Sequence, residues 1–126
     1  MKVLADTSVW VAHFRSANIV WSDLITQDWV LGHPLVLAEI DCGTPPAPRA
    51  QVLGDMALLE QVHAASLPKV FAFIEREKLY GLGCGFVDIA LLASTRITPD
   101  AVLWTLDKNL NNLARRFGVA FAQPLH

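Results

Sequence analysis

Long apolar runs are missing from this 126-residue sequence, although 53% of its residues are hydrophobic. Every run breaks well before the length needed to span a bilayer. The N-terminus also lacks the basic-then-apolar layout of a signal peptide. The sequence therefore predicts a compact protein without a membrane segment, in one domain over residues 1–126.

Cysteine is scarce and does not cluster with histidine. Cys42 and Cys84, the only two cysteines, are too few and too isolated for a disulfide framework or a zinc knuckle. We interpret them as small buried thiols in a reducing, cytoplasmic compartment. His13 and His33 are single histidines near helix ends, where a structural role is the more common one. No Ser/His or Cys/His pairing argues for a protein nucleophile.

An excess of basic residues is also absent. Lys and Arg number 10 against 12 Asp and Glu, which gives a net charge of −2. Nucleic-acid-binding proteins are usually basic, so the overall charge gives no argument for one. A local basic rim around an acidic, metal-loaded centre would still leave the net charge near zero.

Short apolar runs alternate with stretches of helical spacing. We expect strands over residues 2–5, 29–31, 101–106 and 119–121, and helices over residues 7–14, 19–27, 35–42, 49–63, 67–78, 86–97 and 108–117. The Pro-rich segment 43–48 is interpreted as a surface loop, and the Gly-rich segment 81–85 as a connection that lets two elements approach closely. Strands that are apolar throughout predict an α/β fold, with a short, mostly parallel central sheet and helices on both faces.

Two carboxylates directly follow apolar strands. Asp6 ends the first run and is followed at once by Thr7 and Ser8, which are helix-capping residues. Asp107 ends the strongest predicted strand and also precedes a helix. In open α/β folds the carboxyl edge of the sheet is where ligands bind, so both acids are candidate site residues.

Two further acids are placed by helical spacing. Glu39 shares one helical face with Leu35, Ala38 and Cys42, and we expect that face to pack against the core. A carboxylate in such a place is costly unless it is paired or binds a metal. Asp88 lies near the start of helix 86–97, where the helix dipole favours an anion, so its position alone has an equally good structural explanation.

Convergence of these four acids is an economical hypothesis, although spacing alone does not show that they meet. Four like charges would repel strongly and would be stable at neutral pH only with cations bound. Ligand sets made only of oxygen favour Mg²⁺ or Mn²⁺ over zinc. Such a site suits phosphodiester hydrolysis by water that one or two metal ions activate.

Four segments carry a further signal: residues 6–10 (DTSVW), 32–40 (GHPLVLAEI), 85–94 (GFVDIALLAS) and 103–107 (LWTLD). In this order and at this chain length they resemble the PIN-domain ribonucleases, and most of all the VapC toxins of bacterial toxin–antitoxin pairs. The resemblance implies a PIN-like three-layer fold. It also implies that the metal-binding, catalytic acids are Asp6, Glu39, Asp88 and Asp107, supported by the hydroxyls of Thr7 and Thr105.

The same resemblance implies a function. It implies a Mg²⁺- or Mn²⁺-dependent endoribonuclease that acts as the toxin of a type II toxin–antitoxin system and leaves a 5′-phosphate and a 3′-hydroxyl. It also implies a homodimer, an RNA substrate, and a VapB-type antitoxin whose tail blocks the site, in a heterotetramer or larger assembly.

The chain departs from the family pattern in two places. The Pro-rich loop replaces a more charged helical connection, and the helix after Asp107 carries asparagines where basic residues are expected. Lys108, Arg115 and Arg116 remain as candidate RNA-binding residues. Two other functions stay open: a catalytically idle PIN-like module that binds antitoxin or RNA, and a phosphatase-like or receiver-like domain phosphorylated on Asp6. Ser8 argues against the second, because it stands where such phosphatases have a second Asp.

Overall fold

The computed structural model describes residues 1–122 of the chain. In chain order its elements are β1 (Lys2–Ala5), α1 (Thr7–Arg15), α2 (Ile19–Thr26), β2 (Val30–Gly32), α3 (Pro34–Cys42), α4 (Arg49–Ala57), β3 (Glu60–Gln61), α5 (Leu67–Glu77), α6 (Phe86–Ile97), β4 (Ala101–Trp104) and α7 (Lys108–Arg116). No helix within the described residues has the length and apolar content needed to cross a membrane.

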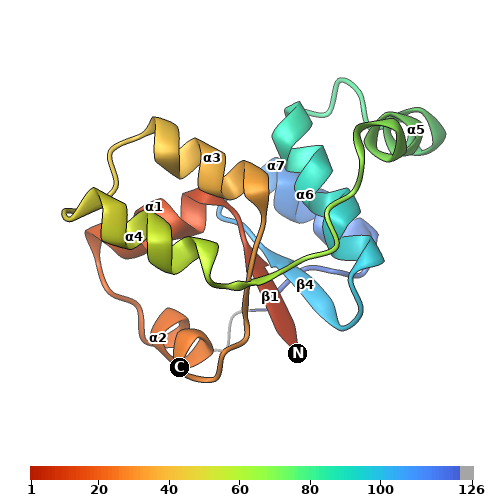
Figure 1. The fold of residues 1–126 in the computed structure, drawn as a ribbon. Helices are drawn as coiled ribbons and strands as arrows, with labels where there is room; N and C mark the ends of the chain where they lie inside the picture. The colour runs from red at the N-terminus through yellow and green to blue at the C-terminus, as the bar shows by residue number, and fades with distance from the viewer. Residues whose placement is uncertain (123–126) are drawn as a thin grey trace.

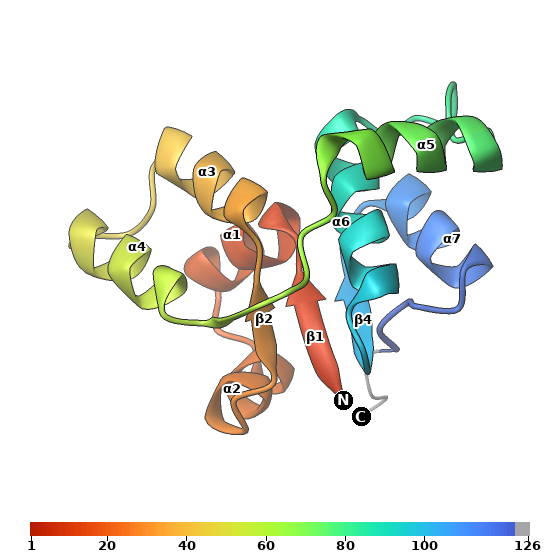
Figure 2. The same cartoon turned by 45° about the vertical axis from the view of Figure 1, so that its right-hand side comes forward.

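The strands form one parallel sheet in the order β3-β2-β1-β4. Their carboxyl ends therefore meet at one edge, which is the upper edge in Figure 2. Helices α1, α3 and α4 lie together on one side of the molecule and α5, α6 and α7 on the other, with the sheet between them (Figures 1 and 2). This arrangement confirms the predicted α/β, PIN-like three-layer fold.

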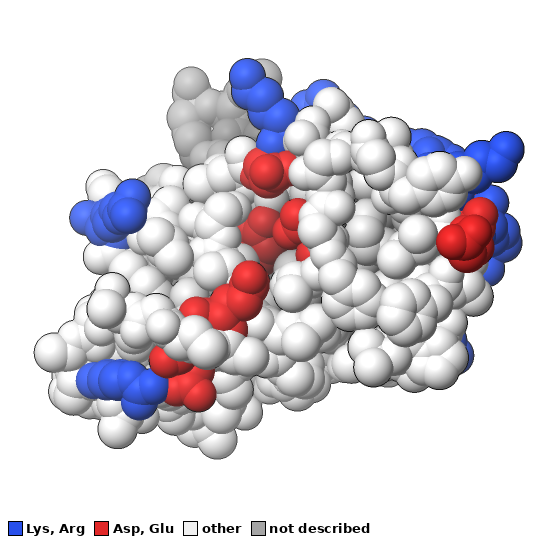
Figure 3. All heavy atoms as spheres, turned by 90° about the horizontal axis from the view of Figure 1, so that it is seen from above, with Lys and Arg blue, Asp and Glu red and all other residues white. Residues whose placement is uncertain are grey.

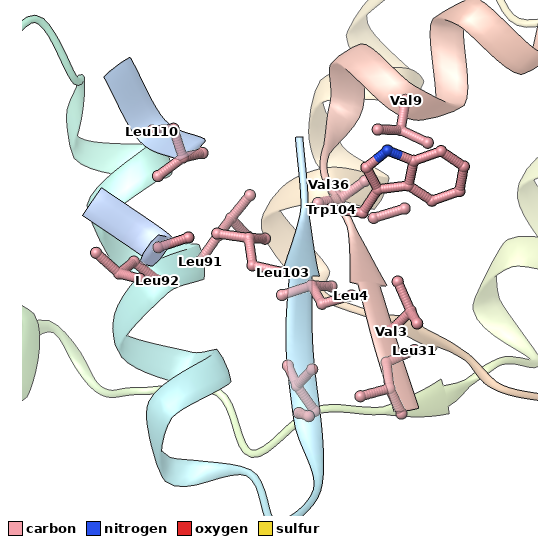
Figure 4. Close-up of a cluster of buried hydrophobic side chains, with 14 of the residues drawn as sticks. Val3, Leu4, Val9, Leu31, Val36, Leu91, Leu92, Leu103, Trp104 and Leu110 are labelled. Carbon is pink, nitrogen blue, oxygen red and sulfur yellow. The ribbon is translucent and has the colours of Figure 1, made fainter. Parts of the chain in front are cut away.

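Helix α6 has the most buried residues of the described helices, seven of its twelve. Figure 4 shows Leu91 and Leu92 of α6 gathered with Leu103 of β4 and Leu110 of α7. Each of these side chains is at most 1% exposed. A fully buried leucine stabilises a fold by about 1.5–3 kcal/mol. This packing holds α6 firmly against the sheet and so fixes the position of Asp88 in its first turn.

Three expected elements differ in the structure. The strand expected over residues 101–106 ends at Trp104, as β4. Helix α4 ends at Ala57, and the chain then becomes extended and forms β3, so the expected helix over residues 49–63 was too long. Leu59 and Val62 pack on the core from this extended segment. Their spacing is compatible with either conformation over so few residues. The expected last strand is reduced to a single parallel bridge between Ala120 and Leu103.

The Gly-rich segment itself packs closely against the start of α7. Gly83 has a positive φ of 82°. A Cβ at this position would overlap the side-chain amide of Asn109, whose Cγ would lie 3.2 Å away. Only glycine fits both the backbone conformation and the contact with the start of α7.

A buried histidine connects α3 to α6. His33 Nδ1 accepts a hydrogen bond from the backbone N–H of Leu35 (3.0 Å) and so caps α3. The proton must therefore lie on Nε2, which donates to the hydroxyl of Ser94, 3.0 Å away. That hydroxyl donates to the carbonyl of Ala90 (2.8 Å) and also accepts from the N–H of Ala65 (3.0 Å). His33 thus has a structural role.

The histidine makes stability depend on pH. Burial lowers the pKa of His33 below its ordinary value of 6.5, so the folded state favours the neutral ring. We expect the free energy of unfolding to fall as pH drops through about 6.5, where the unfolded chain takes up a proton and the folded chain does not. His33→Asn keeps a cap acceptor but loses the bond to Ser94. It should cost about 1–2 kcal/mol at pH 7.5 and weaken the pH dependence.

Urea unfolding at pH 7.5 and 5.5 measures both effects. His63→Asn, at an exposed histidine, is the matched control. The account is contradicted if both variants retain the full wild-type loss of stability between these pH values.

Candidate active site

Asp6 is a nearly buried carboxylate at the end of β1, with 5% of its surface exposed. Its Oδ1 accepts hydrogen bonds from the Ser8 hydroxyl (2.5 Å) and from the backbone N–H of Val9 (3.2 Å). Its Oδ2 accepts from the hydroxyl of Thr105. The Ser8 hydroxyl in turn accepts from the N–H of Leu106 (3.0 Å). Donors from α1 and from the segment after β4 therefore fix the orientation of this carboxylate.

Asp107 lies just beyond β4 and caps α7. Its Oδ1 accepts from the N–H of Leu110 (2.8 Å), and its own N–H donates to the hydroxyl of Thr105 (3.0 Å). Thr105 therefore connects Asp6 and Asp107 through one hydroxyl. Because β1 and β4 are adjacent parallel strands, their two terminal acids lie at the same edge of the sheet.

Glu39 reaches the site from the exposed side of α3. Its Oε1 accepts a hydrogen bond from the hydroxyl of Thr7 (2.6 Å). The buried face of α3 is formed by Val36 and Ile40, whereas Glu39 and Cys42 are exposed. The expectation that Glu39 is held against the core was therefore wrong. Since α3 is apolar around most of its circumference, the spacing could not determine which face packs.

Asp88 is the acid whose pKa is affected by the charges of the other three. Burial is the main cause that raises its pKa, and the charges of Asp107, Asp6 and Glu39 raise it further, while a hydrogen bond from the Gly85 N–H (3.3 Å) acts in the opposite direction. Asp107, Asp6 and Glu39 therefore all lie within electrostatic reach of Asp88. Figure 3, which looks onto this edge from above, shows acidic side chains in a band across the face.

Cys84 is a neighbour of these acids that the sequence did not reveal. Burial, together with the charges of Asp88 and Asp107, raises its pKa to about 11, so its thiol is neutral at physiological pH. Cys84 is half-buried and Cys42 is exposed, so the interpretation of both as buried thiols was wrong. Both residues are partly or fully accessible because they lie near the ends of surface loops.

Ser8 is a second neighbour, which sequence reasoning noted as a helix-capping residue and as the residue in place of a phosphatase's second Asp, but not as a contact of Asp6. Its contact with Asp6 is local, and its contact with the N–H of Leu106 requires the pairing of β1 with β4. A capping-type residue two positions after a strand-end acid was the only available signal.

The donor chemistry of the site fits a hard cation. All four side chains offer carboxylate oxygens. Within residues 1–122, Oε2 of Glu39, Oδ1 of Asp88 and Oδ2 of Asp107 make no hydrogen bond. In the described part of the chain, however, no three acidic, histidine or cysteine side chains are close enough to hold one ion in this conformation. Closing the set around an ion therefore requires the exposed side chains to move toward Asp6.

The predicted basic residues are spread along α7. Lys108 directly follows Asp107 and lies at the site, whereas Arg115 and Arg116 occupy the last turn of the helix. Arg116 bonds to α5, with its guanidinium 3.3 Å from the carbonyl oxygen and 3.6 Å from the carboxylate of Glu77. Only Lys108 of the three is therefore adjacent to the acids.

A cavity of about 480 Å³ opens beside Glu39, between α1, α3 and the Pro-rich loop. Thr7 and Glu39 line one side of the cavity, and Phe14, Arg15 and Pro45 are among the residues that form the rest of its wall. The cavity therefore offers apolar surface and one cation next to Glu39, a combination that suits part of a nucleotide.

Removal of one charge tests the repulsion between the acids. Asp88→Asn keeps an acceptor for the Gly85 N–H but carries no charge. Because the folded state raises the pKa of Asp88, ionisation of this residue opposes folding at any pH above the usual aspartate range of about 4. We expect Asp88→Asn to have a higher melting temperature than the wild type at pH 7 in EDTA, and the difference to shrink toward pH 4.

Thermal unfolding followed by circular dichroism measures this difference. Asp55→Asn, at an exposed residue of α4, controls for the change in net charge. A lower melting temperature for Asp88→Asn than for this control would mean that the charge of Asp88 is not repelled in the fold.

Comparison with known proteins identifies the family. No known protein-family model matches the chain. The chain is 37% identical over 123 residues to Ribonuclease VapC32 in two strains of Mycobacterium tuberculosis, and the alignment covers 98% of this chain and 98% of the relative. With this identity over nearly the full length, and with the fold described above, the chain belongs to the VapC-type PIN-domain ribonucleases.

Proposed function

We propose that this chain is a metal-dependent endoribonuclease and the toxin of a type II toxin–antitoxin system. The observation that carries the proposal is the group of carboxylates at the carboxyl edge of the sheet, where burial and, after it, the charges of three other acids raise the pKa of Asp88. Membership of a ribonuclease family supports an RNA substrate. Repelling carboxylates at a ligand-binding edge are expected where a cation is to be bound.

Asp6, Glu39, Asp88 and Asp107 would hold Mg²⁺ or Mn²⁺. A bound divalent cation lowers the pKa of water and stabilises the charge of the phosphate that is attacked. The chain itself supplies the orientation of the ligands. Asp6 is fixed by Ser8 and Thr105. Glu39 and Asp107 are exposed, and within residues 1–122 each has one carboxylate oxygen in a hydrogen bond and the other available to turn toward an ion. A rigid central acid with adjustable neighbours accommodates both ion and substrate.

The partners are also part of the proposal. A VapB-type antitoxin would cover the site, and two toxin copies would form a homodimer, in a heterotetramer or larger assembly with the antitoxin. Exposed apolar side chains on and after α5 favour self-association: Leu67 is 60%, Phe71 58% and Tyr80 60% exposed. Such large apolar side chains are usually covered by a partner when they lie close together.

Cleavage of RNA tests the catalytic proposal. We expect antitoxin-free protein to cut cellular RNA in Mg²⁺ or Mn²⁺ and not in EDTA, and to leave 5′-phosphates. Asp6→Asn should reduce the rate by about 100-fold or more, because it removes the charge of the central ligand. Asp55→Asn, at an exposed residue outside the site, should cut at the wild-type rate.

The same assay decides between the proposed ribonuclease and the alternative of a catalytically idle binding module. If well-folded wild-type protein cuts no RNA with either cation and does not arrest growth when it is expressed, the enzyme proposal fails. The chain would then be a catalytically idle module that binds antitoxin or RNA.

The Thr105 hydroxyl has a positioning role that can be tested separately. It donates a hydrogen bond to Oδ2 of Asp6 and accepts one from the backbone N–H of Asp107. Thr105→Val removes this hydroxyl with little change in volume, and we expect the cleavage rate to fall about tenfold, as for other residues that orient metal ligands. Thr105→Ser should restore most of the rate. If Thr105→Val cuts at the wild-type rate, the hydroxyl does not orient Asp6 for the reaction.

A further inference from the structure

A second groove, apart from the acids, lies between α5 and α6. It encloses about 350 Å³, and its walls contain Lys69 and Arg76 from α5 and Arg96 from α6. No acidic residue of the described chain lines this groove. Phe73 forms its floor and is 3% exposed. Three cations around a buried aromatic ring therefore face the same space.

Arg96 is held in place without being neutralised. Its guanidinium carbon lies 5.0 Å from the centre of the Phe73 ring and 4.5 Å from that of Phe117. Within residues 1–122 neither Arg96 nor Lys69 forms an ion pair. Stacking on aromatic rings restricts an arginine while its N–H groups remain available to bind an anion.

Arg76 is only weakly paired. Its Nε lies 3.5 Å from the carboxylate of Glu77, and that carboxylate is shared with Arg116 at 3.6 Å. The guanidinium of Arg76 also lies 5.7 Å from the centre of the Phe73 ring. One carboxylate therefore serves two arginines, which leaves the groove with a net positive charge.

Basic side chains are concentrated at this end of the molecule. Figure 3 shows a group of them on the right, beside one acidic group, at the end that α5, α6 and α7 occupy in Figure 1, while other basic side chains lie at the left and along the upper edge. The net charge of the whole chain is −2, and the acids at the sheet edge repel a polyanion. Any attraction for RNA phosphates must therefore be local, and this groove is a surface that provides it.

Helix α6 connects the groove to the acids. Asp88 lies in the first turn of α6 and Arg96 in its last turn. Eight residues of α-helix separate them by about 12 Å along the axis and about a quarter turn around it. Residues 89–95 of α6 are buried, so the strand cannot lie along this helix. Over a separation of this size, an RNA strand that leaves the acids across the neighbouring surface would reach the groove within a few nucleotides.

From these contacts we propose that the α5–α6 groove binds backbone phosphates of the RNA strand that flanks the cleavage site. This inference rests on the proposed function, since it takes RNA as the substrate. Lys69 and Arg76 contact the phosphates from one wall, and Arg96 presents its N–H groups from the other. The groove sets the affinity and direction of the strand, and the acids carry out the cleavage.

The test compares two double variants that remove the same charge. Lys69→Gln/Arg76→Gln changes exposed residues of the groove, and Lys2→Gln/Arg49→Gln changes cations elsewhere on the surface. Binding of a fluorescein-labelled single-stranded RNA in EDTA is followed by anisotropy over a range of KCl concentrations. Cleavage of the same RNA is measured separately with Mn²⁺.

We expect the groove variant to bind RNA about tenfold more weakly at low salt. Its plot of log K against log [KCl] should be less steep by about 1.4, since two phosphate contacts to a single strand are lost at about 0.7 each. KM should rise and kcat should stay unchanged. The control variant should keep the wild-type slope. Arg96→Lys, which keeps the charge but loses the stacked planar group, should weaken binding by a smaller factor.

Equal affinity and equal slope for the groove and control variants would overturn the proposal, whether or not the protein cleaves RNA. If the groove variant instead changes only the oligomeric mass or the binding of an antitoxin, the groove is a protein interface and the proposal is wrong. If the wild type binds RNA but does not cut it, the enzyme proposal fails. The slopes of log K against log [KCl] for the two double variants still test whether the groove binds phosphates.

Discussion

Repulsion between carboxylates is the constraint on which the carboxyl edge of this sheet depends. Asp88 has a raised pKa because it is partly buried and because Asp107, Asp6 and Glu39 act on it. Such a group lowers the stability of the folded chain at neutral pH. The buried leucines of α6 and its neighbours supply the packing that tolerates this cost. The site therefore combines carboxylates that repel one another with a well-packed core that offsets this repulsion, as expected where a cation is to be bound.

Support for the acids comes from hydroxyl groups that join separate elements. Thr105 connects Asp6 at the end of β1 with Asp107 beyond β4, and Thr7 at the start of α1 holds Glu39 of α3. Each of these hydrogen bonds depends on the parallel order of the strands, which brings the ends of neighbouring strands together. The fold therefore positions the acids, and the hydroxyls orient their oxygens.

The sequence predicted the features that local pattern determines. Asp6 and Asp107 were selected as candidates because each follows a predicted apolar strand, and α6 was predicted with its observed limits. The prediction of which face of α3 packs on the core was wrong. An apolar helix has several faces that could pack, and only tertiary contacts determine which one does. The two-residue strand β3 has no periodicity of its own. The α5–α6 groove was not foreseen, because Lys69 and Arg96 meet only through the packing of two helices.

Titration of the protein with Mn²⁺ by calorimetry tests the central claim, that these separate acids act as one cation site. The account predicts that the wild type binds the cation and that Asp88→Asn binds it at least about tenfold more weakly. Asp55→Asn should bind it as the wild type does. The account is contradicted if the wild type binds no divalent cation, or if loss of the Asp88 charge leaves the affinity unchanged.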